Sequence, residues 1–112
     1  MFFTYIVCNR KRGVLYTGHT DNLGLRVEQH KARAYPGFSV KHNCHKLLWF
    51  ETHVSRHEAF VRERQIKDWK RAWKVQMLET LNPDWDDLSL NLTVDEVYSE
   101  RRMYRIPTGA AS

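Results

Sequence analysis

The chain has 112 residues, the usual length of one domain, and 42% of them are hydrophobic and 28% charged. Four Trp, five Tyr and five Phe residues supply large core side chains and argue against a disordered chain. Eighteen Lys and Arg residues against 13 Asp and Glu leave a net charge of +5, which favours an anionic partner.

Three further classes of protein are excluded by the residue patterns. No apolar run approaches the roughly 18 residues that a membrane helix requires, so we expect no membrane partner. The first apolar residues are too few, and lack the charged leader, for a secretory signal. Two cysteines make no disulfide framework and indicate a reducing compartment. We therefore expect a cytoplasmic domain.

Residues 2–18 have the pattern of an antiparallel hairpin. The predicted segments are a strand over 2–8, a polar turn over 9–13 and a strand over 14–18. If Cys8 pairs with Gly13 across a four-residue loop, Tyr5 lies directly opposite Tyr16. The two tyrosines then stand side by side on one face of the sheet.

A helix is predicted over residues 22–34, because capping side chains precede it and Pro36-Gly37 ends it. In this helix Arg26 lies one turn before His30, so the two project to adjacent positions. A loop over 37–45 and a strongly apolar third strand over 46–51 follow.

Residues 55–81 have a helical pattern, with a possible bend near 67–70, and Asn82-Pro83 stops the helix. Glu63 lies on the apolar stripe of this segment, where a carboxylate needs a partner or a metal. An ion pair with Lys67, four residues on, is the simpler interpretation of that position. Taken alone, each tyrosine also fits strand packing, and Arg26 fits a surface residue.

The order of these residues is more specific than any one of them. Tyr5-Ile6 is followed by Leu15-Tyr16-Thr17-Gly18, and then by Thr20-Asp21-Asn22-Leu23, Arg26-Val27 and His30. This string resembles the GIY-YIG nuclease superfamily, and most closely its small stand-alone bacterial members. Further blocks typical of that subgroup occur downstream in the same order: Lys46–Glu51, Arg62–Lys67, Trp69–Lys74 and Leu81–Trp85.

The resemblance implies an α+β fold, a small three-stranded antiparallel sheet flanked by helices with the active site on one face. It also implies hydrolysis of phosphodiester bonds in DNA with one divalent cation, Mg²⁺ or Mn²⁺. Glu63 corresponds to the metal-binding glutamate, and a carboxylate suits Mg²⁺. The family's site residues match Tyr5, Tyr16, Arg26, His30, Glu63 and Asn82.

Individual roles follow from the chemistry of these side chains. The guanidinium of Arg26 can hold the scissile phosphate in a bidentate fork. One tyrosine is expected to take the proton from the attacking water while the other orients it, and the sequence leaves open which. His30 could donate to a phosphate oxygen or assist proton transfer, but its core-facing position fits a packing role as well.

The helical segment also carries basic residues interleaved with tryptophans, a pattern that suits contacts with phosphates. A solvated helix face is the alternative. The residues expected to bind nucleic acid are Lys67, Lys70, Arg71 and Lys74.

Two features keep a second function open. His19 follows the second tyrosine motif, where several catalytic members of the family carry lysine. The nuclease-like domain is expected to cover residues 1–90, which leaves no room for a targeting domain. Residues 91–112 are expected to be a tail in which 94–104 could form a short helix. Besides an endonuclease acting on branched or damaged DNA in repair, the chain could be a non-catalytic nucleic-acid-binding module, or need a partner protein for targeting.

Overall fold

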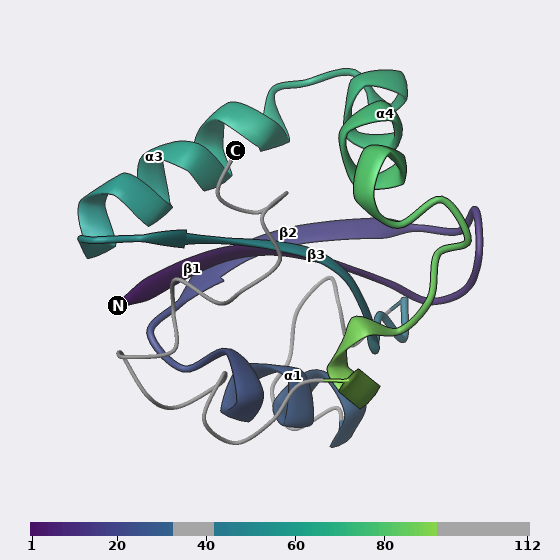
Figure 1. Cartoon of the computed structure of the whole chain (residues 1–112), viewed down its shortest axis with the longest axis horizontal. Helices are drawn as coiled ribbons and strands as arrows, with labels where there is room; N and C mark the ends of the chain where they lie inside the picture. Colours follow the sequence, from purple (N-terminus) through teal and green to yellow (C-terminus); the bar gives the residue numbers. More distant parts are fainter. Residues whose placement is uncertain (33–41, 92–112) are drawn as a thin grey trace.

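The structure is a computed structural model that describes residues 1–32 and 42–91 (Figure 1). The predicted loop between these two ranges and the predicted tail, including its short helix, lie outside the described residues. Within those residues the elements are β1 (Phe2–Cys8), β2 (Leu15–Thr20), α1 (Leu23–Ala32), β3 (Lys46–His53), α3 (Arg56–Lys67), α4 (Arg71–Leu81) and the short 3₁₀ helix η1 (Leu88–Asn91). This α+β arrangement confirms the predicted fold class.

The described strands form one antiparallel sheet with β1 between β2 and β3. The register of β1 and β2 differs from the prediction by two residues, because Cys8 pairs with Leu15 and not with Gly13. Tyr5 consequently lies opposite Gly18, and Tyr16 lies opposite Val7. Since a shift by two residues preserves the face of every side chain, the tyrosines still share a face but are diagonal neighbours.

Side chains stabilise the longer turn between β1 and β2. The amide oxygen of Asn9 accepts a hydrogen bond from the backbone N–H of Val14 at 2.9 Å. From α4, the guanidinium of Arg71 donates to the carbonyl oxygens of Arg12 and Gly13, at 3.2 and 2.7 Å. The turn therefore depends on a helix that follows it by more than fifty residues.

An irregularity interrupts the pairing of β1 with β3. Ile6 pairs with Trp49 and Val7 pairs with Leu47, which leaves Leu48 as an extra residue of β3. The carbonyl oxygen of Leu48 accepts a hydrogen bond from the side chain of Asn82 at 3.0 Å. The segment after α4 thus satisfies a backbone group at the irregularity.

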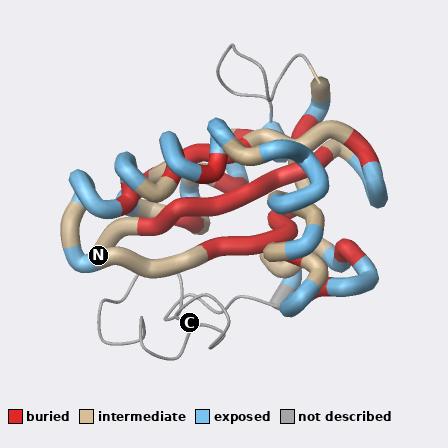
Figure 2. The backbone as a smooth tube through the Cα atoms, turned by 90° about the horizontal axis from the view of Figure 1, so that it is seen from above, coloured by how far each residue is buried: buried red, intermediate tan, exposed pale blue. Residues whose placement is uncertain are grey.

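Helices cover both faces of the sheet, α1 on one side and α3 with α4 on the other (Figure 1). The first face forms a core around Tyr5, Val7 and Val27, and the second around Ile6, Trp49 and Ile66. In Figure 2 the strands are buried along most of their length, while the outer turns of the helices are exposed. Successive side chains of β1, such as Tyr5, Ile6 and Val7, therefore alternate between the two cores.

The predicted division of residues 55–81 into two helices is confirmed. The hydroxyl of Ser55 accepts a hydrogen bond from the backbone N–H of Glu58, which caps the start of α3. The chain then leaves helical structure between Lys67 and Arg71. None of the described helices is long and apolar enough to span a membrane.

Candidate active site

Tyr5, Tyr16 and His30 meet on the face of the sheet covered by α1. The hydroxyl of Tyr5 lies 2.9 Å from Nε2 of His30, within hydrogen-bonding distance. The ring centroids of Tyr5 and Tyr16 lie 5.5 and 5.6 Å from that of His30. The structure therefore brings together three of the side chains that the sequence predicted.

Gly18 makes this arrangement possible. A Cβ atom at position 18 would lie 2.6 Å from the hydroxyl oxygen of Tyr5 and 3.2 Å from the ring of Tyr16. Both distances are shorter than ordinary van der Waals contact. The phenol of Tyr5 therefore occupies the space that the Cβ atom of any residue other than glycine would fill at position 18.

His30 is buried inside this cluster and carries no charge at neutral pH. Burial, and to a lesser extent the positive charge of Arg26, lower the pKa of His30 to about 4. Arg26, one turn earlier on α1, is half-buried. The helix thus places a permanent cation beside the tyrosine cluster and a neutral imidazole within it.

Glu63 lies on the other face of the sheet, on α3. One of its carboxylate oxygens is 2.5 Å from Nδ1 of His19, and the other accepts a hydrogen bond from the ammonium of Lys67 at 2.5 Å. Burial alone would raise the pKa of Glu63, but the hydrogen bonds with Lys67 and His19 outweigh it and keep the pKa below its usual value. The ion pair with Lys67 that the sequence suggested is therefore present.

At the edge strand β2, the side chain of Lys67 lies close to site residues from both faces of the sheet. Its ammonium pairs with Glu63 and also lies 5.7 Å from the centroid of the Tyr16 ring. The family resemblance implied an active site on one face of the sheet, but the expected site residues lie on both faces. They meet at the edge strand, where the side chain of Lys67 extends from the carboxylate to the phenol.

His19 is a site residue whose contact the sequence did not reveal. Strand alternation places it on the face opposite Tyr16, but which helix covers that face depends on tertiary structure. In the fold its ring lies against Phe60 at 5.7 Å between centroids, and its Nδ1 faces Glu63. One sequence signal could have indicated this contact: His19 stands where several catalytic members of the family carry lysine.

Asn82 does not lie with the other predicted site residues. It is buried at the end of α4, beside β3, two strands away from Tyr16. Its amide nitrogen donates to the carbonyl oxygens of Leu48 and Asp86, at 3.0 and 2.9 Å, and its oxygen accepts from the backbone N–H of Asp86. Every hydrogen-bonding atom of the amide therefore serves the backbone.

The residues predicted to bind nucleic acid lie where α3 ends and α4 begins, and we call them the basic surface: Lys67, Lys70, Arg71 and Lys74. Burial lowers the pKa of Lys74, and the positive charges of Arg71 and Lys67 lower it further. Positive charge is therefore concentrated at this place. Two members also have structural contacts, Lys67 with Glu63 and Arg71 with the β1–β2 turn.

The acidic and imidazole groups restrict the kind of metal site that the chain can offer. Among residues 1–32 and 42–91, no group of three or more His, Cys, Asp and Glu is arranged to hold an ion. One carboxylate can nevertheless hold Mg²⁺, which keeps several waters and uses phosphate oxygens of the substrate. Glu63 therefore fits a hydrated hard cation, provided that Lys67 or His19 releases one oxygen.

Comparison with known proteins agrees with the motifs found in the sequence. The model of the GIY-YIG catalytic domain matches residues 1–76. A UPF0213 protein of Staphylococcus epidermidis is 33% identical over 78 residues, covering 69% of this chain and 93% of that protein. One from Staphylococcus haemolyticus is 34% identical over 77 residues, with the same coverage. The solution NMR structure of a UPF0213 protein from Bacillus halodurans has a TM-score of 0.48 and 23% identity, covering 78% of this chain and 93% of that one.

The chain belongs to the GIY-YIG catalytic domain family, a family of nuclease-type domains. Within that family it is similar to small UPF0213 proteins, and it covers 93% of the length of the two staphylococcal ones. The resemblance deduced from the order of tyrosine, arginine, histidine and glutamate is thereby confirmed.

Proposed function

We propose that this protein is a divalent-metal-dependent DNA endonuclease that cuts phosphodiester bonds in branched or damaged DNA during repair. The observation that carries the proposal is the position of Lys67, between the carboxylate of Glu63 and the ring of Tyr16. A carboxylate that would hold the metal and a phenol that would accept a proton thus lie on either side of one ammonium, at the edge strand β2. In the proposed mechanism both groups act on the same phosphodiester, so they have to lie close together.

Glu63 would hold Mg²⁺ or Mn²⁺, and the bound cation would supply Lewis-acid stabilisation of the leaving oxygen. Both carboxylate oxygens have partners, so one of them has to become available. Lys67 is the partner that can leave, because its side chain is 43% exposed and its ammonium can move into water. Once released from the carboxylate, this ammonium can still lie beside the ring of Tyr16.

Tyr16 is the better candidate for accepting the proton of the attacking water. It is half-exposed at the edge strand, whereas Tyr5 is 1% exposed and hydrogen-bonded to His30. The phenol of Tyr16 must ionise before it can accept a proton, and the neighbouring Lys67 stabilises that anion. The ring of Tyr16 is then held in place by contact with His30, which Tyr5 positions through its hydrogen bond.

Arg26 is the residue that would bind the scissile phosphate. Its guanidinium offers a fork of N–H donors that matches two phosphate oxygens. Arg26 lies one helical turn before His30 on α1, so its charge is near the tyrosine cluster and contributes to the lowered pKa of that histidine. His30 itself is neutral at pH 7, so it would orient its neighbours without contributing charge.

A second candidate function is DNA binding without useful turnover. The double pairing of Glu63 with His19 and Lys67 favours it, because a carboxylate with both oxygens engaged binds a cation less readily. In that case the basic surface would contact phosphates and the carboxylate would only stabilise the fold. Activity of the isolated chain separates the two functions.

The test is cleavage of labelled duplex, flapped, branched and single-stranded DNA in Mg²⁺, Mn²⁺ or EDTA. The variants are Glu63→Gln, Tyr16→Phe and Tyr5→Phe, with Glu58→Gln as a matched control on an exposed turn of α3. We expect metal-dependent cuts that Glu63→Gln and Tyr16→Phe abolish and that Glu58→Gln retains. Tyr5→Phe should retain more activity than Tyr16→Phe.

DNA binding is measured in parallel, so that loss of catalysis is distinguished from loss of contact. Cleavage that persists in EDTA, or in Glu63→Gln, would refute the metal role of Glu63. Salt-sensitive binding without any cleavage by the wild-type chain would refute the endonuclease and support the binding module.

A further inference from the structure

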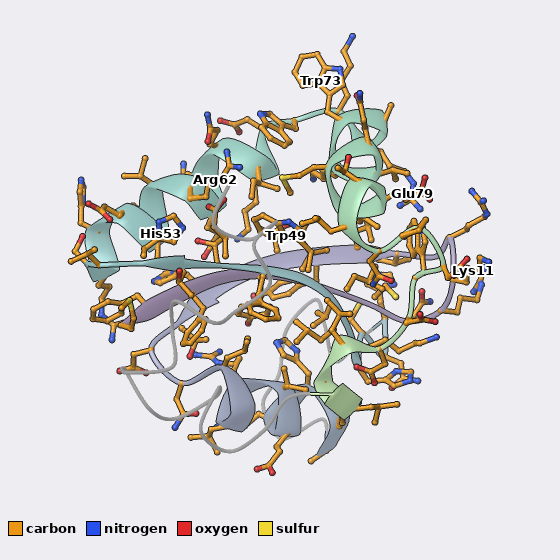
Figure 3. The ribbon with its side chains drawn as sticks, in the orientation of Figure 1. Lys11, Trp49, His53, Arg62, Trp73 and Glu79 are labelled. Carbon is orange, nitrogen blue, oxygen red and sulfur yellow. The ribbon has the colours of Figure 1, made fainter. Side chains whose placement is uncertain are left out.

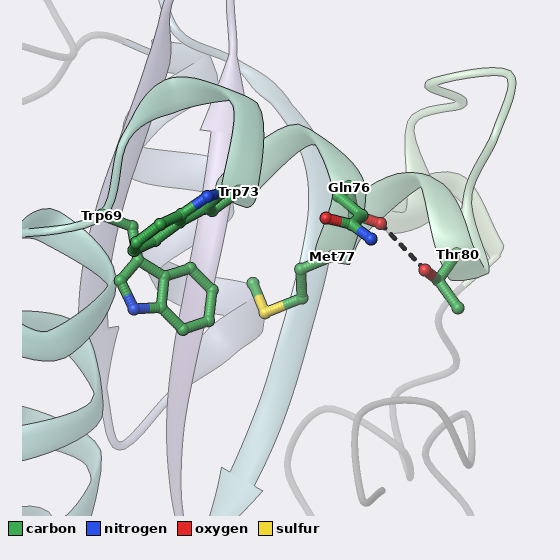
Figure 4. A pocket seen from close by; sticks show the side chains of 5 residues that line it. All are labelled: Trp69, Trp73, Gln76, Met77 and Thr80. Atoms are coloured by element: carbon green, nitrogen blue, oxygen red, sulfur yellow. Dashed lines mark hydrogen bonds between the residues drawn. The ribbon is translucent and has the colours of Figure 1, made fainter.

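A hollow of about 590 Å³ opens on the outer side of α4, away from the sheet (Figure 4). Its size is within the range of small-molecule sites, roughly 300–1,000 Å³. None of its lining residues carries a charge: Trp69, Trp73, Gln76, Met77 and Thr80. Two indoles and a thioether form most of this surface, which suits a flat apolar ligand.

Trp73 is exposed in a way that the fold does not require. Trp49 and Trp85 are 2% and 1% exposed and belong to the core, whereas Trp73 is 52% exposed. In Figure 3 its indole projects from the first turn of α4 into solvent, while Trp49 lies between sheet and helices. Packing therefore accounts for Trp49 and Trp85 but not for the exposed face of Trp73.

The indole of Trp73 is supported from one side by Trp69. The two ring planes meet at 77° with their centroids 6.5 Å apart, so they form a corner. Trp69 packs against the core, and the guanidinium of Arg62 lies 5.3 Å from its ring centroid. A flat ligand on Trp73 would thus meet a fixed second wall, and little conformational entropy would be lost on binding.

Cationic residues precede and follow Trp73 in the chain. The ammonium of Lys70 is 6.0 Å from the ring centroid of Trp73, and Lys74 follows one residue later on α4. Both belong to the basic surface, whose member Lys67 is paired with Glu63. An apolar stacking surface thus adjoins positive charge and continues towards the candidate active site.

We propose that this hollow binds an unpaired base of single-stranded DNA, which stacks on Trp73 while the adjoining phosphates contact Lys70 and Lys74. Aromatic side chains beside a positive track are the means by which single strands are bound without sequence readout. Paired bases are enclosed in the duplex stack and cannot reach the indole. Because the basic surface beside Trp73 includes Lys67, the partner of Glu63, this inference rests on the proposed nuclease and specifies flapped DNA as its preferred substrate class.

The test measures binding in EDTA, so that it does not depend on cleavage. A flapped duplex carrying 2-aminopurine at the first unpaired position is compared with a fully paired duplex of the same length. Stacking on an indole quenches 2-aminopurine fluorescence, and anisotropy gives the affinity. The variants are Trp73→Ala, Trp73→Phe and, as a control elsewhere on α4, Leu81→Ala, whose side chain is 43% exposed and outside the hollow.

Wild-type protein should quench the flap base and bind the flapped DNA more tightly than the duplex. Trp73→Ala should lose the quenching and bind the flap about tenfold more weakly, which is the usual size of one stacking contact. Its duplex affinity should change less than twofold. Trp73→Phe, which keeps an aromatic face, and Leu81→Ala should resemble the wild type.

Other results would overturn the proposal. One is unchanged binding of flapped DNA by Trp73→Ala, and another is an equal loss of affinity for flapped and duplex DNA. A third is a wild-type dimer that Trp73→Ala makes monomeric, which would assign the hollow to a second copy of the chain. Duplex cleavage by Trp73→Ala tests the nuclease separately. A chain that cuts DNA without flap preference refutes only the stacking site, and one that quenches the flap base but never cuts refutes only the nuclease.

Discussion

Gly18 lies directly opposite Tyr5 in the β1–β2 pair, and the phenol of Tyr5 extends over the position where a side chain at residue 18 would begin. The nearest atom is the hydroxyl oxygen, at 2.6 Å from an ideal Cβ, followed by the ring carbon Cζ at 2.8 Å. The same hydroxyl is hydrogen-bonded to His30. One glycine thus determines the position of the tyrosine and, through it, of the histidine.

Gly18→Ala should therefore destabilise the fold by about 1–3 kcal/mol, the usual cost of forcing a methyl group into a packed core. Tyr5→Phe removes the atom nearest the new methyl group, so the double variant Gly18→Ala/Tyr5→Phe should recover part of that loss. Urea unfolding of the four proteins in this cycle measures the coupling free energy. Losses that simply add would show that the methyl group does not meet the hydroxyl.

The lowered pKa of His30 predicts a loss of stability in mild acid. In the unfolded chain the imidazole takes up a proton near pH 6.5, whereas in the fold it does so only near pH 4. The unfolded state therefore binds more protons between these values, so the free energy of unfolding falls as the pH drops from 6.5 to 4. The limiting loss is about 3 kcal/mol.

Urea unfolding at pH 7 and pH 5 should show about 2 kcal/mol of this loss, because pH 5 is still above the pKa of His30 in the fold. His30→Gln serves as the control because glutamine keeps a polar partner for Tyr5. The difference in stability between the two pH values should be smaller in His30→Gln than in the wild type. An NMR titration of the His30 ring protons with a midpoint near 6.5 would contradict the argument.

Local patterns were sufficient to predict most elements but not their tertiary contacts. The strands, α1 and the division between α3 and α4 follow from alternation, caps and breaks that lie within a few residues of each element. The register of β1 with β2 was predicted wrongly, because it depends on the side chain of Asn9 and on Arg71, which is 58 residues from Gly13. A two-residue shift changes no face, so the alternation pattern gave no sign of it.

The candidate site shows the same division between local and distant information. Arg26 and His30 are one helical turn apart, and their nearness follows from that spacing. The pair formed by His19 and Glu63 joins residues 44 positions apart and depends on which helix covers the sheet. Family motifs identified both residues as positions of interest, but only the fold brings them into contact.

Asn82 should behave as a structural residue. In Asn82→Asp a carboxylate oxygen replaces the amide nitrogen that donates to the carbonyls of Leu48 and Asp86, so acceptors would face acceptors. We expect a loss of about 2–3 kcal/mol, as for other buried groups left without a partner. Asn22→Ala, which removes one exposed bond to the backbone N–H of Leu25, should cost about 1 kcal/mol.

Thermal unfolding gives these differences in stability, and DNA cleavage is then compared below both transition midpoints. Asn82→Asp that remains folded should keep most of its activity. An inactive variant with an unchanged Tm would instead assign Asn82 a role in the reaction.

His19 should tune the carboxylate of Glu63 without being required for DNA binding. Its Nδ1 is 2.5 Å from one oxygen of that carboxylate, so His19→Ala removes a group that orients the expected metal ligand. Groups that orient a metal ligand in this way typically contribute 10- to 100-fold in metal affinity or activity. We expect His19→Ala to slow metal-dependent cleavage by that factor and to raise the Mg²⁺ concentration needed for half-maximal rate.

His19→Lys keeps a donor at this position, as several catalytic family members do, and should retain more activity than His19→Ala. His57→Ala, on an exposed turn of α3, is the matched control and should leave the rate unchanged. The readout is the cleavage rate across a Mg²⁺ titration, with DNA affinity measured in EDTA. If His19→Ala has the wild-type rate and metal dependence, the pair with Glu63 has no part in the reaction. If it loses rate and DNA affinity equally, His19 belongs to substrate binding, because a group that acts through the carboxylate leaves the DNA contact intact.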